Sequence, residues 1–349
     1  MSGAPPGGRP QSARDTERAP LVIGLVNNMP DAALQTTERQ FRELLDAAAG
    51  PSPVAVRLIA LANVPRGAAA RAELEARYES ADVVATGVID GLIVTGTEPR
   101  SARLSDEPYW GALEALIEAA HGQTLSTVWS CLAAHAAVLA LDGVERQRYA
   151  HKLFGVFECA ASAAHPLTEG LRASRRVPHS RFNDVPESAL REAGYQILAR
   201  SDAVGADLFI KEGPSLFVFL QGHPEYDRSA LMREYRRDVG RYLGGERDDF
   251  PRMPRGYFAR EATRRFAAYQ ASAMERRHPD ALREFPALDE GQLPEPLWRE
   301  GAIQLYANWL TLLRQRRDAT LHGALRGGSR ARRSESGAPL LAPKANHGP

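Results

Sequence analysis

Short apolar runs alternate with helix-like segments along much of this 349-residue chain. The apolar runs end in turn residues, which is typical of strands that are buried on both faces of a parallel sheet. The expected strands span Leu21–Val26, 54–61, 91–99 and Ser126–Ser130. Apolar residues at helical spacing cover 33–48, 109–121 and 132–141. This alternation predicts an α/β fold in which helices flank a mostly parallel sheet.

The second half of the chain predicts a β-hairpin followed by three helices. Residues 208–211 and 216–221 are expected to be the two strands of the hairpin, and the sequence EGPS between them is the turn. Helices are expected at 228–243, 261–277 and 302–315. The middle helix falls within a polar, Arg-rich stretch that we interpret as an insertion.

The composition predicts one domain over residues 21–320, with the helical insertion at about 244–293. The two ends, 1–20 and 321–349, are rich in Gly, Pro, Ser and Arg and lack an apolar core. Such segments cannot bury enough apolar surface to fold, so we expect both to be disordered tails.

Charge and cysteine content exclude several classes of protein. The 44 Lys and Arg residues nearly balance the 43 Asp and Glu residues, which gives no electrostatic argument for a nucleic-acid or membrane partner. Two cysteines are too few for a disulfide framework and fit a reducing compartment. No apolar run approaches the roughly 20 residues of a membrane span. We therefore expect a cytoplasmic protein.

The sequence WSCLAAHAA places Cys131 between an expected strand and an expected helix. A free cysteine is usually a buried, inert side chain. At the carboxyl end of a strand in an α/β sheet, however, Cys131 would lie where such folds place their ligand-binding and catalytic residues. A catalytic role needs a base and a group that orients this base.

His223 and Glu225 supply these two groups in the sequence GHPEY, directly after an expected strand. Residues at i and i+2 of an extended segment face the same way, so the carboxylate can hold one ring nitrogen while the other faces the thiol. Each residue alone has a structural explanation, but together they form the Cys–His–carboxylate arrangement of an activated nucleophile. His135, four residues after Cys131, is a weaker candidate base. Cys159 is expected to be buried, and its spacing does not indicate a metal site.

Five motifs in a fixed order resemble the homoserine O-succinyltransferase family, whose acetyl-using members are homoserine O-acetyltransferases. They are NNMP, GLIVTG, WSCLAAHAA, PHSRF and GHPEYD, and the match runs from about residue 21 to 313. The resemblance implies a class I glutamine amidotransferase-like fold, a Cys–His–Glu triad and a role in methionine biosynthesis. It also implies a homodimer that needs no cofactor, with acyl-CoA as a co-substrate.

In such a family Cys131 would take the acyl group as a thioester, and the hydroxyl of the amino-acid acceptor would then attack it in a ping-pong reaction. His223 would deprotonate this hydroxyl, and Glu225 would hold the imidazole. The tetrahedral intermediates need an oxyanion hole. We predict its donors to be the N–H of Leu132 and a backbone N–H of the loop at Thr97.

The resemblance also assigns the substrate contacts. The predicted acceptor-binding residues are Lys152, Ser180, Arg181, Glu234 and Arg237. Among these, Arg237 is the candidate for the acceptor carboxylate, because a guanidinium binds a carboxylate through two parallel hydrogen bonds.

By the resemblance, Arg100 occupies the position that selects the acyl donor, where succinyl-using members have a glycine and acetyl-using members have a glutamate. Its positive charge favours succinyl-CoA slightly over acetyl-CoA, whereas Glu98 weighs against this preference. The loop after NNMP also lacks the lysine that is usual in the family.

Three alternatives stay open. The acceptor could be L-serine, which is one methylene shorter than homoserine, because a single methylene gives only about 1–3 kcal/mol of discrimination. The same triad could serve a glutaminase or amidase, although the Gly-x-Cys-x-Gly elbow usual in glutaminases is absent around Cys131. A non-catalytic binding protein is the third alternative, and the presence of all three triad residues argues against it.

Overall fold

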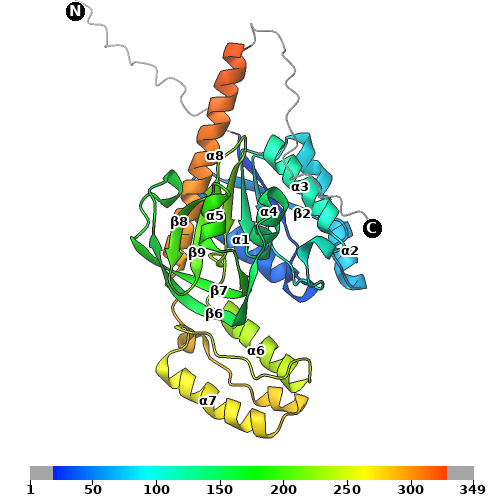
Figure 1. Ribbon diagram of the computed structural model, residues 1–349, viewed down its shortest axis with the longest axis vertical. Helices are drawn as coiled ribbons and strands as arrows, with labels where there is room; N and C mark the ends of the chain where they lie inside the picture. Colours follow the sequence, from blue (N-terminus) through cyan, green and yellow to red (C-terminus); the bar gives the residue numbers. More distant parts are fainter. Residues whose placement is uncertain (1–18, 328–349) are drawn as a thin grey trace, which may run out of the picture.

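The computed structural model describes residues 19–327 of the chain (Figure 1). Most of the two expected tails lies outside the described residues. The last helix, α8, spans Arg299–Gly327, so helical structure continues beyond residue 320, where the second tail was expected to begin.

Ten strands form one mixed sheet with the order β3-β2-β1-β4-β5-β10-β9-β8-β6-β7. The strands from β3 to β10 in this order pair in parallel, and the others pair antiparallel. The bounds are β1 Leu21–Val26, β2 Val54–Ala60, β3 Glu79–Ser80, β4 Gly91–Val94, β5 Ser126–Ser130, β6 Gln147–Ala161, β7 Ser174–Asp184, β8 Gln196–Ser201, β9 Gly205–Lys211 and β10 Leu216–Leu220.

Helices cover both faces of the parallel half, which confirms the predicted α/β architecture (Figure 1). The α-helices are α1 Leu34–Ala49, α2 Ala68–Arg77, α3 Trp110–Gln123, α4 Leu132–Asp142, α5 Glu187–Glu192, α6 Ala230–Leu243, α7 Arg260–Glu275 and α8. Short 3-10 helices are η1 Asp31–Ala33, η2 Ala81–Thr86, η3 Leu104–Asp106, η4 Pro166–Thr168, η5 Pro279–Glu284 and η6 Glu290–Gln292. Apolar side chains of α3 and α4 pack on one face of the sheet, and those of α1 and α8 pack on the other.

The antiparallel half holds most of what the sequence did not predict. The β9–β10 hairpin was predicted and is confirmed. Strands β6, β7 and β8 were not predicted, and the motif PHSRF lies in β7. The long β6–β7 hairpin pairs Phe154 with Ser180 and extends the sheet toward α6 and α7 (Figure 1).

Helices α6 and α7 form a small lobe below the sheet with the segment that leads to α8 (Figure 1). Its apolar core includes Tyr235, Phe266 and Trp298. The Nε1–H of Trp298 donates to the carbonyl of Tyr226 over 2.8 Å, which ties this lobe to the segment after β10. Among the residues that the structure describes, no helix is both long and apolar enough to cross a membrane.

Candidate active site

Cys131 occupies a sharp turn between β5 and α4. Its φ is 52° and its ψ is −113°, and a positive φ is costly for a residue that has a side chain. The N–H of Cys131 donates to the carbonyl of Leu220 on β10 over 2.7 Å, so the neighbouring strand holds the turn. The side chain is partly exposed and lines a cavity. This is the geometry of a nucleophile on a strand-to-helix elbow.

His223 and Glu225 lie just beyond the carboxyl end of β10, beside this turn. The Nδ1 atom of His223 is 2.8 Å from Oε1 of Glu225, and the ring lies close enough to Cys131 for the sulfur to raise the pKa of the imidazole. The backbone N–H of His223 donates to the carbonyl of Pro178 on β7 over 2.8 Å. The structure therefore brings Cys131, His223 and Glu225 together in the order that the sequence predicted.

The surroundings of His223 favour its protonated form. Burial alone lowers the pKa of this imidazole, but the negative charges of Cys131 and Glu225 offset burial and raise the pKa well above its ordinary value. The ring of Tyr226 stacks on the imidazole with a centroid distance of 4.2 Å and an interplanar angle of 16°. A protonated ring beside the sulfur is the arrangement that keeps a thiolate ready for attack.

The two segments that were predicted to form the oxyanion hole lie close together at the cavity. Leu132 is the first residue of α4, and the N–H of a first helical residue has no acceptor within the helix. A Cβ on Gly96 would lie 3.0 Å from the nitrogen of Leu132 and 2.7 Å from its Cβ, so only glycine lets the loop after β4 approach so closely. Thr97 follows in this loop, and both Leu132 and Thr97 line the cavity.

A group of polar side chains from β6, β7 and α6 lines the same cavity; we call it the charged wall, and it consists of Lys152, Ser180, Glu234, Arg237 and Asp238. Nζ of Lys152 lies 3.1 Å from Glu234 and 2.8 Å from Asp238. Nε of Arg237 donates to Asp238 over 3.0 Å, and the hydroxyl of Ser180 donates to Glu234. The wall thus holds two carboxylates and two cations in one network.

Glu234 is buried and ionised in this network. Burial raises its pKa, but the charges of Lys152 and Arg237 and hydrogen bonds from Ser180 and Tyr226 lower the pKa to about 2. The Tyr226 hydroxyl donates over 2.5 Å, so the ring that stacks on His223 also joins the triad to the wall. Nε and one terminal nitrogen of Arg237 donate to Asp238, but the side chain is still 47% exposed, so part of its guanidinium is accessible to an anion.

Two predicted contact residues do not face the cavity. Arg181 is buried and donates to Asn183, Asp184 and Val204, so its guanidinium is already used within the β-sheet. Arg100 is exposed and lies outside the cavity lining. The cavity lining therefore does not include these two side chains, and the roles of Arg181 in acceptor binding and of Arg100 in donor selection stay predictions.

The structure adds residues that the sequence analysis did not single out. Asp238 and Tyr226 each lie beside a residue that was predicted, and their chemistry was visible in the sequences RRDV and HPEYD. Glu98, which the sequence analysis considered only for its charge, lines the cavity and accepts from both terminal nitrogens of Arg241 on α6, over 2.7 and 2.9 Å. This ion pair links the loop after β4 to α6, the helix that carries three residues of the charged wall.

His135 is a structural residue. Its Nε2 lies 2.7 Å from Oε1 of Gln221, and burial together with the charge of Arg181 lowers its pKa to about 3. The ring is only 2% exposed, so it cannot reach a substrate in the cavity. Its place in the core therefore argues against His135 as the base.

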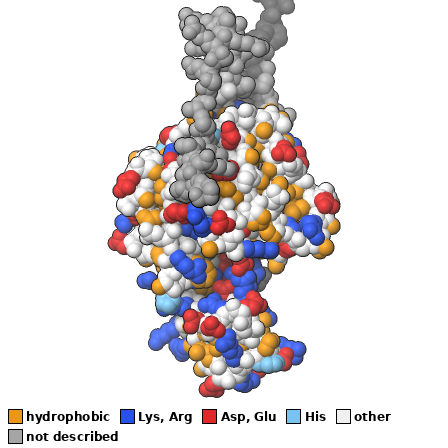
Figure 2. All heavy atoms as spheres, turned by 45° about the vertical axis from the view of Figure 1, so that its right-hand side comes forward, with side chains coloured by type: hydrophobic (Ala, Val, Ile, Leu, Met, Phe, Trp, Pro, Cys, Tyr) orange, Lys and Arg blue, Asp and Glu red, His pale blue; other side chains and the backbone are white. Residues whose placement is uncertain are grey.

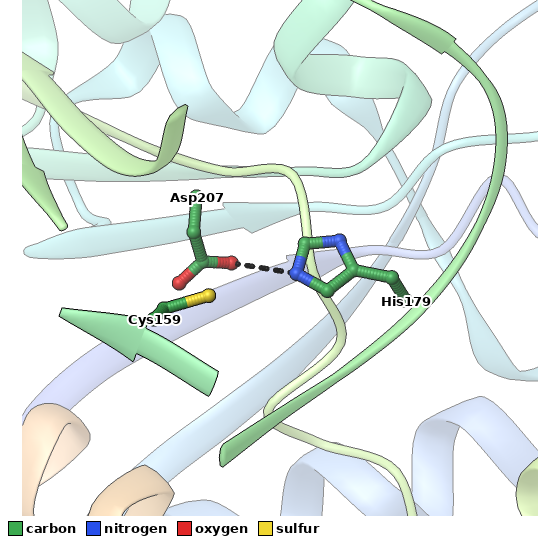
Figure 3. Close-up of side chains that lie close together, drawn as sticks. All are labelled: Cys159, His179 and Asp207. Carbon is green, nitrogen blue, oxygen red and sulfur yellow. Dashed lines mark ion pairs between the residues drawn. The ribbon is translucent and has the colours of Figure 1, made fainter. Parts of the chain in front are cut away.

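Cys159 is buried as predicted, but it belongs to a cluster that its sequence spacing did not reveal. Figure 3 shows its sulfur beside Asp207 and His179, and one ligand atom from each lies within 4.8 Å of the others. These residue types can bind a transition metal. The Asp207 carboxylate, however, already binds the guanidinium of Arg175 over 2.5 Å. Burial lowers the pKa of His179, and the positive charge of a second guanidinium, that of Arg181, lowers this pKa further. Two nearby cations make this position unfavourable for another.

The triad and the charged wall share a cavity of about 850 Å³. It continues to the segment 246–252 and to α7, so it lies between the sheet and the small lobe. Figure 2 shows acidic and basic side chains gathered at the narrow junction between these two parts. A cavity of this size admits a substrate much larger than an amino acid.

Comparisons with known proteins identify the family of the chain. The family model for homoserine O-succinyltransferase matches residues 8–319. The homoserine O-succinyltransferase of Methylorubrum extorquens is 50% identical over 85% of this chain and 88% of that protein. The enzyme of the same name from Bradyrhizobium japonicum is 47% identical over 88% of this chain and 94% of that protein.

Among solved structures, the chain is similar to a glutamine amidotransferase from Methylobacillus flagellatus. The TM-score is 0.49 and the sequence identity is 16%, and the match covers 84% of this chain and 94% of that one.

The match to the family model spans most of the chain, and these two relatives are each aligned over more than four-fifths of it. On these grounds, the chain is an acyltransferase that belongs to the homoserine O-succinyltransferase family.

Proposed function

We propose that the protein transfers a succinyl group from succinyl-CoA to the hydroxyl of L-homoserine, through a thioester on Cys131, in methionine biosynthesis. The observation that carries this proposal is the Cys131–His223–Glu225 arrangement at the wall of an 850 Å³ cavity. The same cavity presents a charged wall suited to an amino acid.

In the first half-reaction the Cys131 thiolate attacks the thioester carbonyl of the donor. The carbonyl oxygen becomes an oxyanion that the N–H groups near Leu132 and Thr97 stabilise. The intermediate collapses by breaking the bond from carbon to the CoA sulfur, and imidazolium His223 gives its proton to this sulfur. Free CoA leaves, and an acyl-enzyme with a neutral His223 remains.

In the second half-reaction neutral His223 takes the proton of the acceptor hydroxyl. The resulting oxygen nucleophile attacks the acyl-enzyme, and the bond from carbon to the Cys131 sulfur breaks. The product ester leaves, and the thiolate and the imidazolium are restored. Glu225 holds His223 in the required orientation through both steps.

The charged wall would bind the two charged groups of the acceptor. The half-exposed guanidinium of Arg237 suits the α-carboxylate, and the ionised Glu234 suits the α-ammonium. Lys152 and Ser180 hold Glu234 in place. The acceptor would therefore lie with its hydroxyl toward His223, since Tyr226 connects Glu234 to this ring.

The succinyl donor is proposed from the names of the relatives rather than from Arg100. The side chain of Arg100 lies outside the cavity lining, whereas Glu98 is part of it. Donor preference is therefore a property to be measured together with the choice between homoserine and serine.

The test is intact-protein mass measurement after succinyl-CoA is added without an acceptor. We expect the wild-type chain to gain the mass of one succinyl group, and Cys131→Ala to gain nothing. Cys159→Ala is the matched control and should be acylated like the wild type, because that sulfur is fully buried. An adduct on Cys131→Ala would refute the assignment of the nucleophile.

Two further measurements address the alternatives. Hydrolysis of glutamine without CoA would indicate an amidase instead. A higher kcat/KM for serine than for homoserine would change the acceptor but keep the acyl transfer.

A further inference from the structure

Two buried polar atoms near the triad lack a hydrogen-bond partner among the described residues. One is Oε2 of Glu225, whose other oxygen binds His223. The other is the hydroxyl of Tyr306 on α8, a side chain that is 1% exposed. A buried donor or acceptor without a partner is unfavourable, and a buried charged group is more so.

The path of α8 brings Tyr306 toward the triad. Trp298, just before α8, donates to the carbonyl of Tyr226 beside Glu225, so the helix begins at the edge of the sheet that carries the chemistry. Farther along, Nε1–H of Trp309 donates over 3.0 Å to Ser126 at the opposite end of β5. Tyr306 lies between these two anchors, and side chains on a helix point back toward its N-terminus.

We infer that the Tyr306 hydroxyl is the donor that serves Oε2 of Glu225, and that it thereby positions the triad carboxylate. The two atoms are not hydrogen-bonded to each other in the structure, so the bond would form through a turn of the carboxyl group or through a bridging water. The hydroxyl proton of a tyrosine rotates freely about its C–O bond, so it can turn to this oxygen. The inference rests on the proposed role of Glu225 in the triad, and it makes Tyr306 a positioning residue rather than a catalytic one.

The electrostatics of Tyr306 agree with this placement. Burial raises the pKa of its hydroxyl well above the ordinary value, and the negative charge of Glu225 raises it further. The hydroxyl thus stays protonated and remains a donor. With one oxygen on His223 and the other on Tyr306, the carboxylate would be held at both ends, which fixes the ring that faces Cys131.

The test is Tyr306→Phe, which removes only the hydroxyl. We expect kcat to fall about tenfold, since a hydrogen bond to a charged group is lost, whereas KM for homoserine and for succinyl-CoA should stay within about twofold of wild type. Tyr235→Phe is the matched control, because Tyr235 is also fully buried with an unpartnered hydroxyl and lies outside the cavity lining. This control should keep wild-type kcat.

A double-mutant cycle with Glu225→Ala separates positioning from general destabilisation. The readout is the rate at which iodoacetamide alkylates Cys131, which can be measured in every variant. If Tyr306 acts through Glu225, Tyr306→Phe slows alkylation in the wild-type background and has no further effect when Glu225 is absent. An equal effect in both backgrounds, or no effect in either, overturns the inference.

The outcomes also separate this inference from the proposed triad. If Glu225→Ala leaves alkylation and turnover unchanged, the triad itself is wrong, and the role of Tyr306 falls with it. If Glu225→Ala is impaired but Tyr306→Phe is normal, the triad stands and only the inference about Tyr306 fails.

Discussion

The triad and the charged wall line one cavity but are held in different ways. Backbone hydrogen bonds fix the triad, from Cys131 to the carbonyl of Leu220 and from His223 to the carbonyl of Pro178. The charged wall depends on bonds between side chains, such as Lys152 with Glu234 and Arg237 with Asp238. The first region is part of the sheet, whereas the second joins two strands and a helix that are far apart in the sequence.

This difference teaches how the two regions can divide the reaction. A rigid triad suits chemistry that both substrates share, because the same sulfur and ring act on donor and acceptor. The wall touches the acceptor alone in our proposal. Substitutions in the triad should therefore impair both half-reactions, whereas substitutions in the wall should impair only the second.

The largest effect is expected for His223→Ala. Loss of the general base should slow acylation of Cys131 and transfer to homoserine, each by about 10²–10⁴-fold. The measurement is rapid quenching with intact-protein mass detection for acylation, and product formation from isolated acyl-enzyme for the second step.

His121→Ala is the control for this substitution. Its ring stacks edge-on against Phe217 and does not line the cavity, so both half-reactions should proceed at the wild-type rate. If His223→Ala slowed only one of the two steps, the idea of a shared base would be wrong.

A smaller and more selective effect is expected for Arg237→Ala. Removing the guanidinium should raise KM for homoserine about 10–100-fold, because a charge-assisted contact to the carboxylate is lost. Acylation by succinyl-CoA should change by less than about threefold, since the donor does not use this contact. Steady-state kinetics and single-turnover acylation measure the two quantities.

Arg233→Ala is the matched control on the same helix. Arg233 pairs with Asp227 and lies outside the cavity lining, so its loss should leave KM for homoserine unchanged. A matching defect in acylation for Arg237→Ala would mean that the two regions do not divide the reaction as we propose.

The contrast between the two regions also explains which parts of the fold and of the site could be predicted from the sequence. The α/β fold and the meeting of the triad residues could be predicted, because parallel strands bring their carboxyl ends to one edge. The reason given for Glu225 was wrong, because residues 224–225 form a turn, closed by the N–H of Tyr226 on the carbonyl of His223, and not an extended segment. The rule for parallel strands needed no knowledge of side-chain partners.

The charged wall could be reached only through the family resemblance. Its geometry depends on the register of the β6–β7 hairpin, which pairs Phe154 with Ser180, 26 positions later in the chain. Strand β6 also lacks a regular alternation of buried and exposed residues, so the sequence did not predict it as a strand. The direction of the Arg181 side chain was equally beyond local rules, since bonds to Val204 and Asp184 decide it. Non-local contacts of this kind are absent from a single sequence.

The smallest effect is expected at the ion pair of Glu98 with Arg241, which joins the loop after β4 to the helix that carries part of the charged wall. Both side chains are partly exposed, at 51% and 35%, and such pairs contribute about 0.2–1 kcal/mol. Glu98→Gln would remove a negative charge from the cavity wall and free the guanidinium of Arg241 to attract a carboxylate. We therefore expect the ratio of kcat/KM for succinyl-CoA to that for acetyl-CoA to rise by less than about fivefold.

Arg100→Ala is the control and should leave this ratio within about twofold, because its side chain lies outside the cavity lining. A larger change with Arg100→Ala than with Glu98→Gln would return donor selection to the position that the sequence first indicated.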